Sequence, residues 1–352
     1  MITRRFPLAI LLLVSLLFSG CGGGSRTVNE SKLNATGTHI YALAVMNDGS
    51  LLASGGQTSR FDTAADLTNE ETNDDEDTYR LVGFTAFYNA ETAQELKTLE
   101  YKHDVVSLAA SPKRDTIAFG STDHRVRVYD FITGKIRWEG TQHAGHIKGI
   151  AYSPDGEILA SIGSDDKTLL LQRVLDGTVL RSISIDKGQN TALSYSPDGT
   201  KIAVTAGAFV NLYSASTGEL VHAFRGGVGQ LYALTYSPDG NWIATGGTGG
   251  LVSVYSALDY SIGSDLNGHL DDVLSLAFSP DSRFLLSGSK DATAILWDYV
   301  GKRKRLLLDR DGVGFVNAVV FTADGTRLLL GRDEGIIYIY DTRTGQLVQT
   351  IG

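Results

Sequence analysis

The chain has 352 residues, of which 42% are hydrophobic and 20% are charged, and its formal net charge is −9. This acidic balance lacks the basic field that binding to a nucleic acid backbone requires, so we expect no nucleic acid partner. Cys21 is the only cysteine, which excludes a disulfide within the chain.

Residues 1–20 are predicted to be a signal peptide for export rather than part of the fold. Two arginines precede an apolar run from Leu8 to Leu17, a run too short for a membrane span, which needs about 20 apolar residues. Residues 17–21, Leu-Phe-Ser-Gly-Cys, resemble the bacterial lipobox, although Phe18 stands where Leu is usual. The resemblance implies that Cys21 is lipidated and becomes the N-terminus of the mature lipoprotein. The alternative is an ordinary signal peptide with an incidental cysteine.

A flexible tether is predicted between the signal and the folded part. Residues 21–37 begin Cys-Gly-Gly-Gly-Ser and stay mostly polar, a composition that buries little surface and favours a spacer. At ~3.3 Å per residue this tether reaches at most roughly 50 Å. Because Gly22 is not the Asp that marks inner-membrane retention in enterobacteria, we expect the outer membrane, on its periplasmic side.

One short turn recurs seven times along the remaining chain. From Pro112 onward its occurrences are 41 to 43 residues apart, within the ~40–45-residue period of four-stranded propeller blades. The first interval, from Asn47 to Pro112, is longer, at 65 residues. The turns begin at Asn47, Pro112, Pro154, Pro197, Pro238, Pro280 and Ala323.

A pattern of four strands accompanies each turn. A large aliphatic residue and then a smaller one precede it, as in Leu43-Ala44, and small residues suit the crowded strand nearest a propeller axis. A second apolar run ends in Gly-rich sequence, a third ends in an aromatic residue such as Tyr129, and a further turn leads to a polar outer strand. The sequence therefore predicts an all-β fold, a seven-bladed β-propeller of four-stranded antiparallel blades.

The sixth repeat carries a family motif. His269 follows a glycine at its start, Ser287 and Asp291 come next, and Trp297 is followed by an aspartate. These residues resemble the WD-repeat (WD-40) family, and the resemblance covers residues 38–352. It implies that His269, Ser287, Asp291 and Trp297 form a hydrogen-bonded structural tetrad within one blade.

The tetrad motif is complete only in the sixth repeat. Blade three keeps His143, Ser161 and Asp166 but has Gln172 in place of the aromatic residue. Because buried polar groups need partners, we interpret these residues as structural rather than catalytic.

As the outer strand of the last blade we favour the C-terminal segment over residues 31–34. The predicted blades are about 38–100, 101–141, 142–185, 186–226, 227–267, 268–311 and 312–352.

The long first interval predicts an insertion, residues 57–80, between the second and third strands of blade one. Residues 61–77 contain eight acidic residues and no Lys or Arg, and by the family resemblance such loops lie on the face usually used for partners. The candidate partner contact is its acidic run, Asp74, Asp75, Glu76 and Asp77. Dense like charge also favours a solvated, disordered loop, and carboxylates can hold calcium.

Other candidate sites are weaker. His143 and His146 offer two imidazoles on one loop, but no third ligand is evident beyond His103 or His124, so we predict no metal site. The basic run 302–305 can touch anionic lipid, although a solvated turn also explains it. We find no nucleophile elbow, phosphate loop or His-Glu-x-x-His motif.

These features predict a non-catalytic, membrane-anchored protein–protein interaction scaffold of the bacterial cell envelope, with no cofactor and no small-molecule substrate. Its expected partners are envelope proteins, and its expected membrane contact is lipid on Cys21. Two alternatives stay open. One is an enzyme or a small-ligand-binding or metal-binding propeller, which predicts convergent carboxylates or histidines at the mouth of the central channel. The other is a calcium-dependent adhesion module that uses the acidic insertion.

Overall fold

The computed structural model describes residues 38–46, 49–62, 78–113, 115–185, 188–189, 191–308 and 314–352. They belong to one compact unit, Leu33–Gly352. The predicted signal peptide, Cys21, the tether and the acidic run at 74–77 lie outside the described residues. In the part of the chain that is described, no helix is long and apolar enough to cross a membrane.

Seven four-stranded antiparallel sheets follow one another along the chain, each with its strands in sequence order. The first three are β1 (His39–Val45), β2 (Leu51–Asp62), β3 (Thr78–Asn89), β4 (Glu95–Tyr101); β5 (Val105–Ala110), β6 (Thr116–Ser121), β7 (Val126–Asp130), β8 (Lys135–Gly140); and β9 (Ile147–Tyr152), β10 (Ile158–Gly163), β11 (Thr168–Arg173), β12 (Val179–Ser184). The last four are β13 (Leu193–Tyr195), β14 (Lys201–Ala206), β15 (Phe209–Ser214), β16 (Leu220–Arg225); β17 (Leu231–Tyr236), β18 (Trp242–Gly247), β19 (Leu251–Ser256), β20 (Ile262–Asn267); β21 (Val273–Phe278), β22 (Leu285–Ser289), β23 (Ala294–Asp298), β24 (Arg303–Leu308); and β25 (Val316–Phe321), β26 (Arg327–Arg332), β27 (Ile337–Asp341), β28 (Leu347–Ile351).

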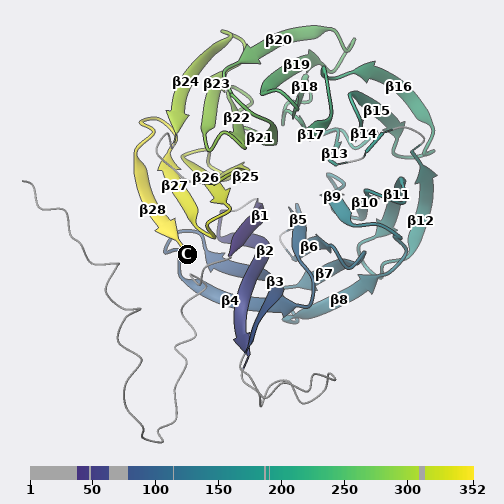
Figure 1. The fold of residues 1–352 in the computed structure, drawn as a ribbon. Coiled ribbons are helices and arrows are strands. Elements are labelled where there is room, and N and C mark those ends of the chain that lie inside the picture. The colour runs from purple at the N-terminus through teal and green to yellow at the C-terminus, as the bar shows by residue number, and fades with distance from the viewer. Residues whose placement is uncertain are drawn as a thin grey trace, which may run out of the picture. The chain divides into compact units, whose positions relative to one another are not determined.

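The sheets form a closed ring around a central axis (Figure 1). Each first strand contacts the first strand of the next sheet, and β25 contacts β1, which closes the ring. The prediction of an all-β, seven-bladed propeller is therefore confirmed. The outer strand of the last blade is β28, and Tyr101, which the period assigned to blade two, is the last residue of β4.

The hydrophobic core lies between the blades. The buried apolar side chains form seven clusters, and each cluster joins two adjacent sheets. Val254 of blade five, for example, shares a cluster with Leu285 and Trp297 of blade six. The middle strands β6 and β7 are buried along their whole length, whereas β12 is almost entirely exposed. A blade can thus bury both faces only by standing between two others.

Glycines on the second strands let neighbouring blades approach each other. A Cβ added at Gly120 would lie 2.4 Å from Ile147 Cγ2, and one at Gly288 would lie 2.7 Å from Val316 Cγ1. Both contacted residues begin the inner strand of the following blade. The Gly-rich ends of the second strands are therefore explained by close packing between sheets.

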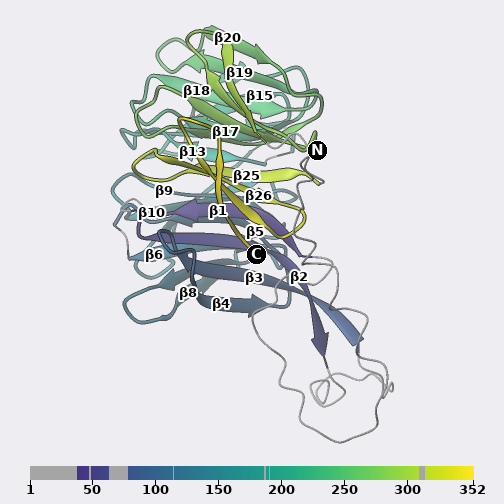
Figure 2. The same cartoon turned by 90° about the vertical axis from the view of Figure 1, so that its left-hand side faces the viewer.

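The insertion in blade one differs from the predicted loop. Strands β2 and β3 stay paired from Leu51 and Asn89 to Asp62 and Thr78, so residues 57–62 and 78–80 are strand. Since β1 begins opposite Gln57, this extended hairpin projects beyond the start of the inner strands (Figure 2). The long interval between the first two turns suggested a loop, but β2 and β3 continue to pair within it.

Candidate functional site

A repeated β-bulge builds a ring of side chains at the start of the inner strands. In blade three, Ile147 pairs with Gly163 and Gly149 with Ile162, which leaves Lys148 as an extra residue. The same skip occurs in the other blades except blade four. Bulges re-aim side chains and are frequent at functional sites. We call the seven residues at this level the mouth ring: Tyr41, Val106, Lys148, Thr191, Tyr232, Leu274 and Asn317.

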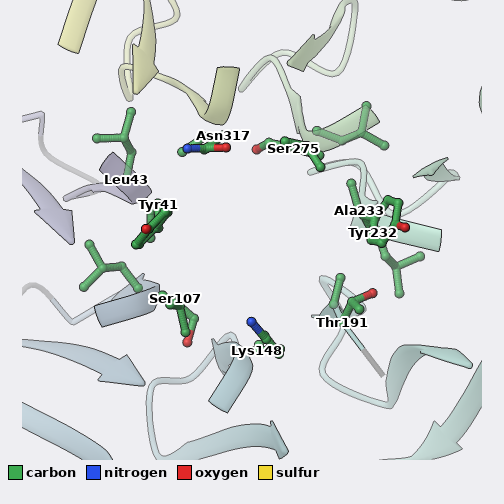
Figure 3. A pocket seen from close by; sticks show the side chains of 18 of the residues that line it. Tyr41, Leu43, Ser107, Lys148, Thr191, Tyr232, Ala233, Ser275 and Asn317 are labelled. Carbon is green, nitrogen blue, oxygen red and sulfur yellow. The ribbon is translucent and has the colours of Figure 1, made fainter. Parts of the chain in front are cut away.

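The mouth ring opens into a cavity of about 200 Å³ in the central channel. Figure 3 shows side chains of the ring around this space, with the amine of Lys148 directed into it. Below the ring the walls carry small residues, such as Ser107, Ala233 and Ser275, and then large aliphatic residues such as Leu43. Of the described residues that line the cavity, Lys148 alone is charged.

Several polar groups of the inner strands hold the bulges in place. Asn317 Nδ2 donates to the carbonyl oxygen of Ile40 at 3.0 Å, and Thr191 Oγ1 donates to that of Leu231 at 2.6 Å. Each of these carbonyls belongs to the residue immediately before the bulged residue of the next blade. Because buried carbonyls need donors, these bonds fix the positions of the ring side chains.

Histidines and an acid gather beside the mouth at blades one to three. Burial raises the pKa of Asp104 above its ordinary value, although the nearby charges of His103, His39, Lys148 and His146 oppose this shift. The alternative of an enzyme or ligand-binding propeller predicted carboxylates or histidines at this mouth. Among the described residues, however, no three His, Cys, Asp or Glu side chains lie close enough to hold a metal ion.

The predicted tetrad of blade six forms one hydrogen-bonded chain. Trp297 Nε1 donates to Ser287 Oγ at 2.8 Å, and Ser287 Oγ lies 2.7 Å from His269 Nε2. His269 Nδ1 lies 3.0 Å from Asp291 Oδ2, which also accepts from the backbone N–H of Leu270 at 2.8 Å. A neutral imidazole with its proton on Nδ1 satisfies every one of these contacts.

Burial and hydrogen bonding fix the charges in this tetrad. Burial lowers the pKa of His269 and outweighs the opposing effect of Asp291. Burial acts to raise the pKa of Asp291, but bonds from Thr293 and Leu270 outweigh it, so this pKa lies below its ordinary value. The side chains of His269 and Trp297 are buried, which leaves them inaccessible to a substrate and indicates a structural role.

Blade three forms most of the same network. His143 Nδ1 lies 2.8 Å from Asp166 Oδ2, and His143 Nε2 lies 2.9 Å from Ser161 Oγ. Gln172 does not join the chain, since its Nε2 instead bonds Gln142 and the backbone of Gly177. His143 is thus held within its blade, and burial lowers its pKa. His146 instead faces His124, with ring centroids 5.4 Å apart.

Blade two replaces the histidine network with an ion-pair network. Arg127 Nη2 lies 2.6 Å from Asp123 Oδ2, and Arg127 Nε lies 2.6 Å from Glu139 Oε2. The guanidinium also lies over the ring of Tyr101, 5.0 Å from its centroid. Sequence reasoning missed Arg127, which the alternation of β7 directs toward Asp123.

The basic run at 302–305 lies mostly on strand β24 rather than in a turn. Arg303 pairs with Asp298 at 2.8 Å. Lys304 Nζ donates to the carbonyl of Gly268 at 3.1 Å, and Arg305 lies over the ring of Phe284. These contacts within blade six give three of its four cations structural partners.

The mouth ring was missed by sequence reasoning, which took the inner strands as apolar and small. A signal was present, because each ring residue precedes the large aliphatic residue of its inner strand by two positions. Comparing the repeats at that position finds Lys148 among neutral residues. The bulge that turns these side chains toward the channel leaves no comparable mark in the sequence.

Models of two known families match parts of the chain. The WD domain, G-beta repeat, matches residues 218–256 and 261–298, and the anaphase-promoting complex subunit 4 WD40 domain matches residues 108–191.

Similar proteins include the serine-threonine kinase receptor-associated protein of Gallus gallus, 35% identical over 92 residues, which are 26% of each chain. Small ribosomal subunit protein RACK1y of Oryza sativa subsp. japonica is 30% identical over 28% of this chain and 31% of its own. Actin-interacting protein 1 of Drosophila melanogaster is 30% identical over 31% of this chain and 18% of its own. The chain thus matches about a third or less of each relative's length.

Proposed function

We propose that this chain, which belongs to the WD-repeat family of β-propellers, is a non-catalytic scaffold that binds protein partners at its channel mouth. The mouth ring carries this proposal. Its side chains differ in charge, size and hydrogen bonding, yet similar bulges in rigid inner strands hold six of the seven. Such a surface is preorganised, which reduces the entropy lost on binding.

The size of the cavity favours a protein partner over a small-molecule substrate. Small-molecule sites usually enclose about 300–1,000 Å³, whereas this cavity measures about 200 Å³ and opens at the mouth. That space suits one side chain of a partner whose remaining surface rests on the surrounding loops. Names of similar proteins, among them a receptor-associated and an actin-interacting protein, agree with a role in protein interaction.

We further propose that lipid on Cys21 anchors the scaffold to the outer membrane, on its periplasmic side. The support is the lipobox resemblance of residues 17–21 and the Gly at position 22. Replacing Cys21 with Ala should move the full chain from the membrane fraction to the soluble fraction of the cell envelope. Ser25→Ala, in the tether, is the matched control and should stay with the membrane. Equal partitioning of both variants would remove the anchor from the proposal.

Crosslinking in intact cells, followed by affinity purification of the full chain, tests the scaffold itself. We expect an envelope protein to co-purify with the wild-type chain and to be depleted when Tyr41 and Leu274 of the mouth ring are replaced by Ala. Recovery of a small metabolite without any protein partner would favour the channel-ligand alternative. An undiminished partner in the double variant would place the binding surface elsewhere.

A further inference from the structure

We propose that the channel mouth binds a carboxylate of the protein partner, an Asp or Glu side chain or a C-terminus, between Lys148 and Tyr232. This inference rests on the proposed scaffold function and names the chemistry of its partner. It concerns blades three to five, where Thr191 separates the two residues along the mouth ring (Figure 3).

Lys148 carries the positive charge of the channel lining, and the acid on which this charge acts is the half-buried Asp104 of the neighbouring blade. The side chain of Lys148 is exposed, and no hydrogen bond or ion pair joins its amine to another described residue. The bulge at Ile147–Gly149 directs the amine into the cavity, where the walls are otherwise neutral (Figure 3). An ammonium in such a place is best satisfied by an anion, because charge-assisted hydrogen bonds are stronger than neutral ones.

Tyr232 supplies a second donor on the same side of the mouth. Its hydroxyl makes no hydrogen bond within the described part of the chain. Lys290 Nζ lies 5.4 Å from the centroid of its ring, and its charge is balanced by Asp272, with which it pairs at 2.9 Å. Thr191 is not an additional donor, since its hydroxyl donates to Leu231.

The rest of the mouth, formed by blades seven to two, is less favourable for an anion. Asp104 precedes β5 in blade two, and Asp333 of blade seven accepts a hydrogen bond from Asn317 Nδ2. Because Asp104 adjoins Lys148, these two carboxyl groups favour an incoming carboxylate on the side of Lys148 that faces Tyr232. The cavity of about 200 Å³ accommodates one side chain with such a group.

Carbodiimide coupling in intact cells tests the contact directly. The reagent condenses an amine with a carboxyl group in contact with it, with loss of water, and mass spectrometry locates the new amide. We expect a peptide of the full-length chain joined through Lys148 Nζ to an acidic residue or C-terminus of another protein. Lys135, an exposed lysine at the start of β8, should not couple to that protein.

Two substitutions separate charge from chemical reactivity. Lys148→Arg retains the cation but cannot form the amide, so the partner should be retained within a few-fold without coupling. Lys148→Gln should weaken retention by about ten- to a hundredfold, as expected for a hydrogen bond to a charged group. Lys135→Gln is the matched control and should leave retention unchanged.

The outcomes distinguish this inference from the scaffold proposal. A partner that is retained equally by wild type and Lys148→Gln overturns the carboxylate site while the scaffold stands. Coupling of Lys148 only to Asp104 of its own chain also overturns it, because the counter-ion would then be internal. Absence of any protein partner for the wild-type chain refutes both proposals.

Discussion

The tetrad of blade six gives a quantitative stability prediction. Ser287 is fully buried and bonds both Trp297 Nε1, at 2.8 Å, and His269 Nε2, at 2.7 Å. Ser287→Ala therefore leaves one buried donor and one buried acceptor without partners. Each such orphaned group costs about 1–3 kcal/mol, so we expect the free energy of unfolding to fall by about 2–6 kcal/mol, measured by urea denaturation.

Blade three offers the matched control for this substitution. Ser161 is equally buried, but its hydroxyl pairs only with His143 Nε2, because Gln172 replaces the tryptophan. Ser161→Ala thus orphans one group, and its cost should be smaller by about 1–3 kcal/mol. The slope of the urea transition should be the same for both variants if both unfold by the same transition. A loss in Ser161→Ala equal to or larger than that in Ser287→Ala would refute the reasoning.

Two further predictions concern pH and packing. Burial lowers the pKa values of His143 and His269, so both histidines take up a proton at a higher pH in the unfolded chain than in the folded chain. The free energy of unfolding should therefore be highest above pH about 6.5. Below that pH it should fall by up to about 1.4 kcal/mol per pH unit for each histidine. Replacing both histidines with Gln should flatten this dependence in urea titrations; an unchanged slope would contradict it. Gly288→Ala should destabilise by about 1–3 kcal/mol through overpacking, because its Cβ would lie 2.7 Å from Val316 Cγ1; an unchanged thermal midpoint would argue against close packing there.

The sequence predicted the features that recur in every repeat. Turn spacing determined the number of blades, and the alternation of residues such as Leu43-Ala44 located the inner strands. The side chains that bond within blades three and six were also identified, because they resemble the motif of the WD-repeat family. His143, Ser161 and Asp166 are examples.

Features that depend on register or on contacts between blades were not predictable. The bulges that aim Lys148 and Tyr232 at the channel shift pairing by one residue without altering composition. The role of Arg127 depends on Asp123 and Glu139, which the turn between β6 and β7 and the pairing of β7 with β8 bring to it. The hairpin extension of blade one appeared as a loop because its turn signals lie far apart along the chain.

Blade three shows how a propeller tolerates the loss of a tetrad aromatic residue. Trp138 of the preceding blade packs against Gly177 near Gln172, and its Nε1 donates to the carbonyl of Val174 at 2.8 Å. A neighbouring blade therefore supplies the aromatic packing that Gln172 cannot. Within the described residues the buried Oε1 of Gln172 has no hydrogen-bond partner, whereas its Nε2 makes two bonds of 3.3 Å. Gln172→Met, which keeps the length of the side chain, relieves the first and loses the second, so the free energy of unfolding should stay within about 1 kcal/mol of wild type. Gln349→Met on the exposed outer strand β28 is the control, and a loss of stability beyond that range, specific to Gln172→Met, would mean that the amide is satisfied and needed.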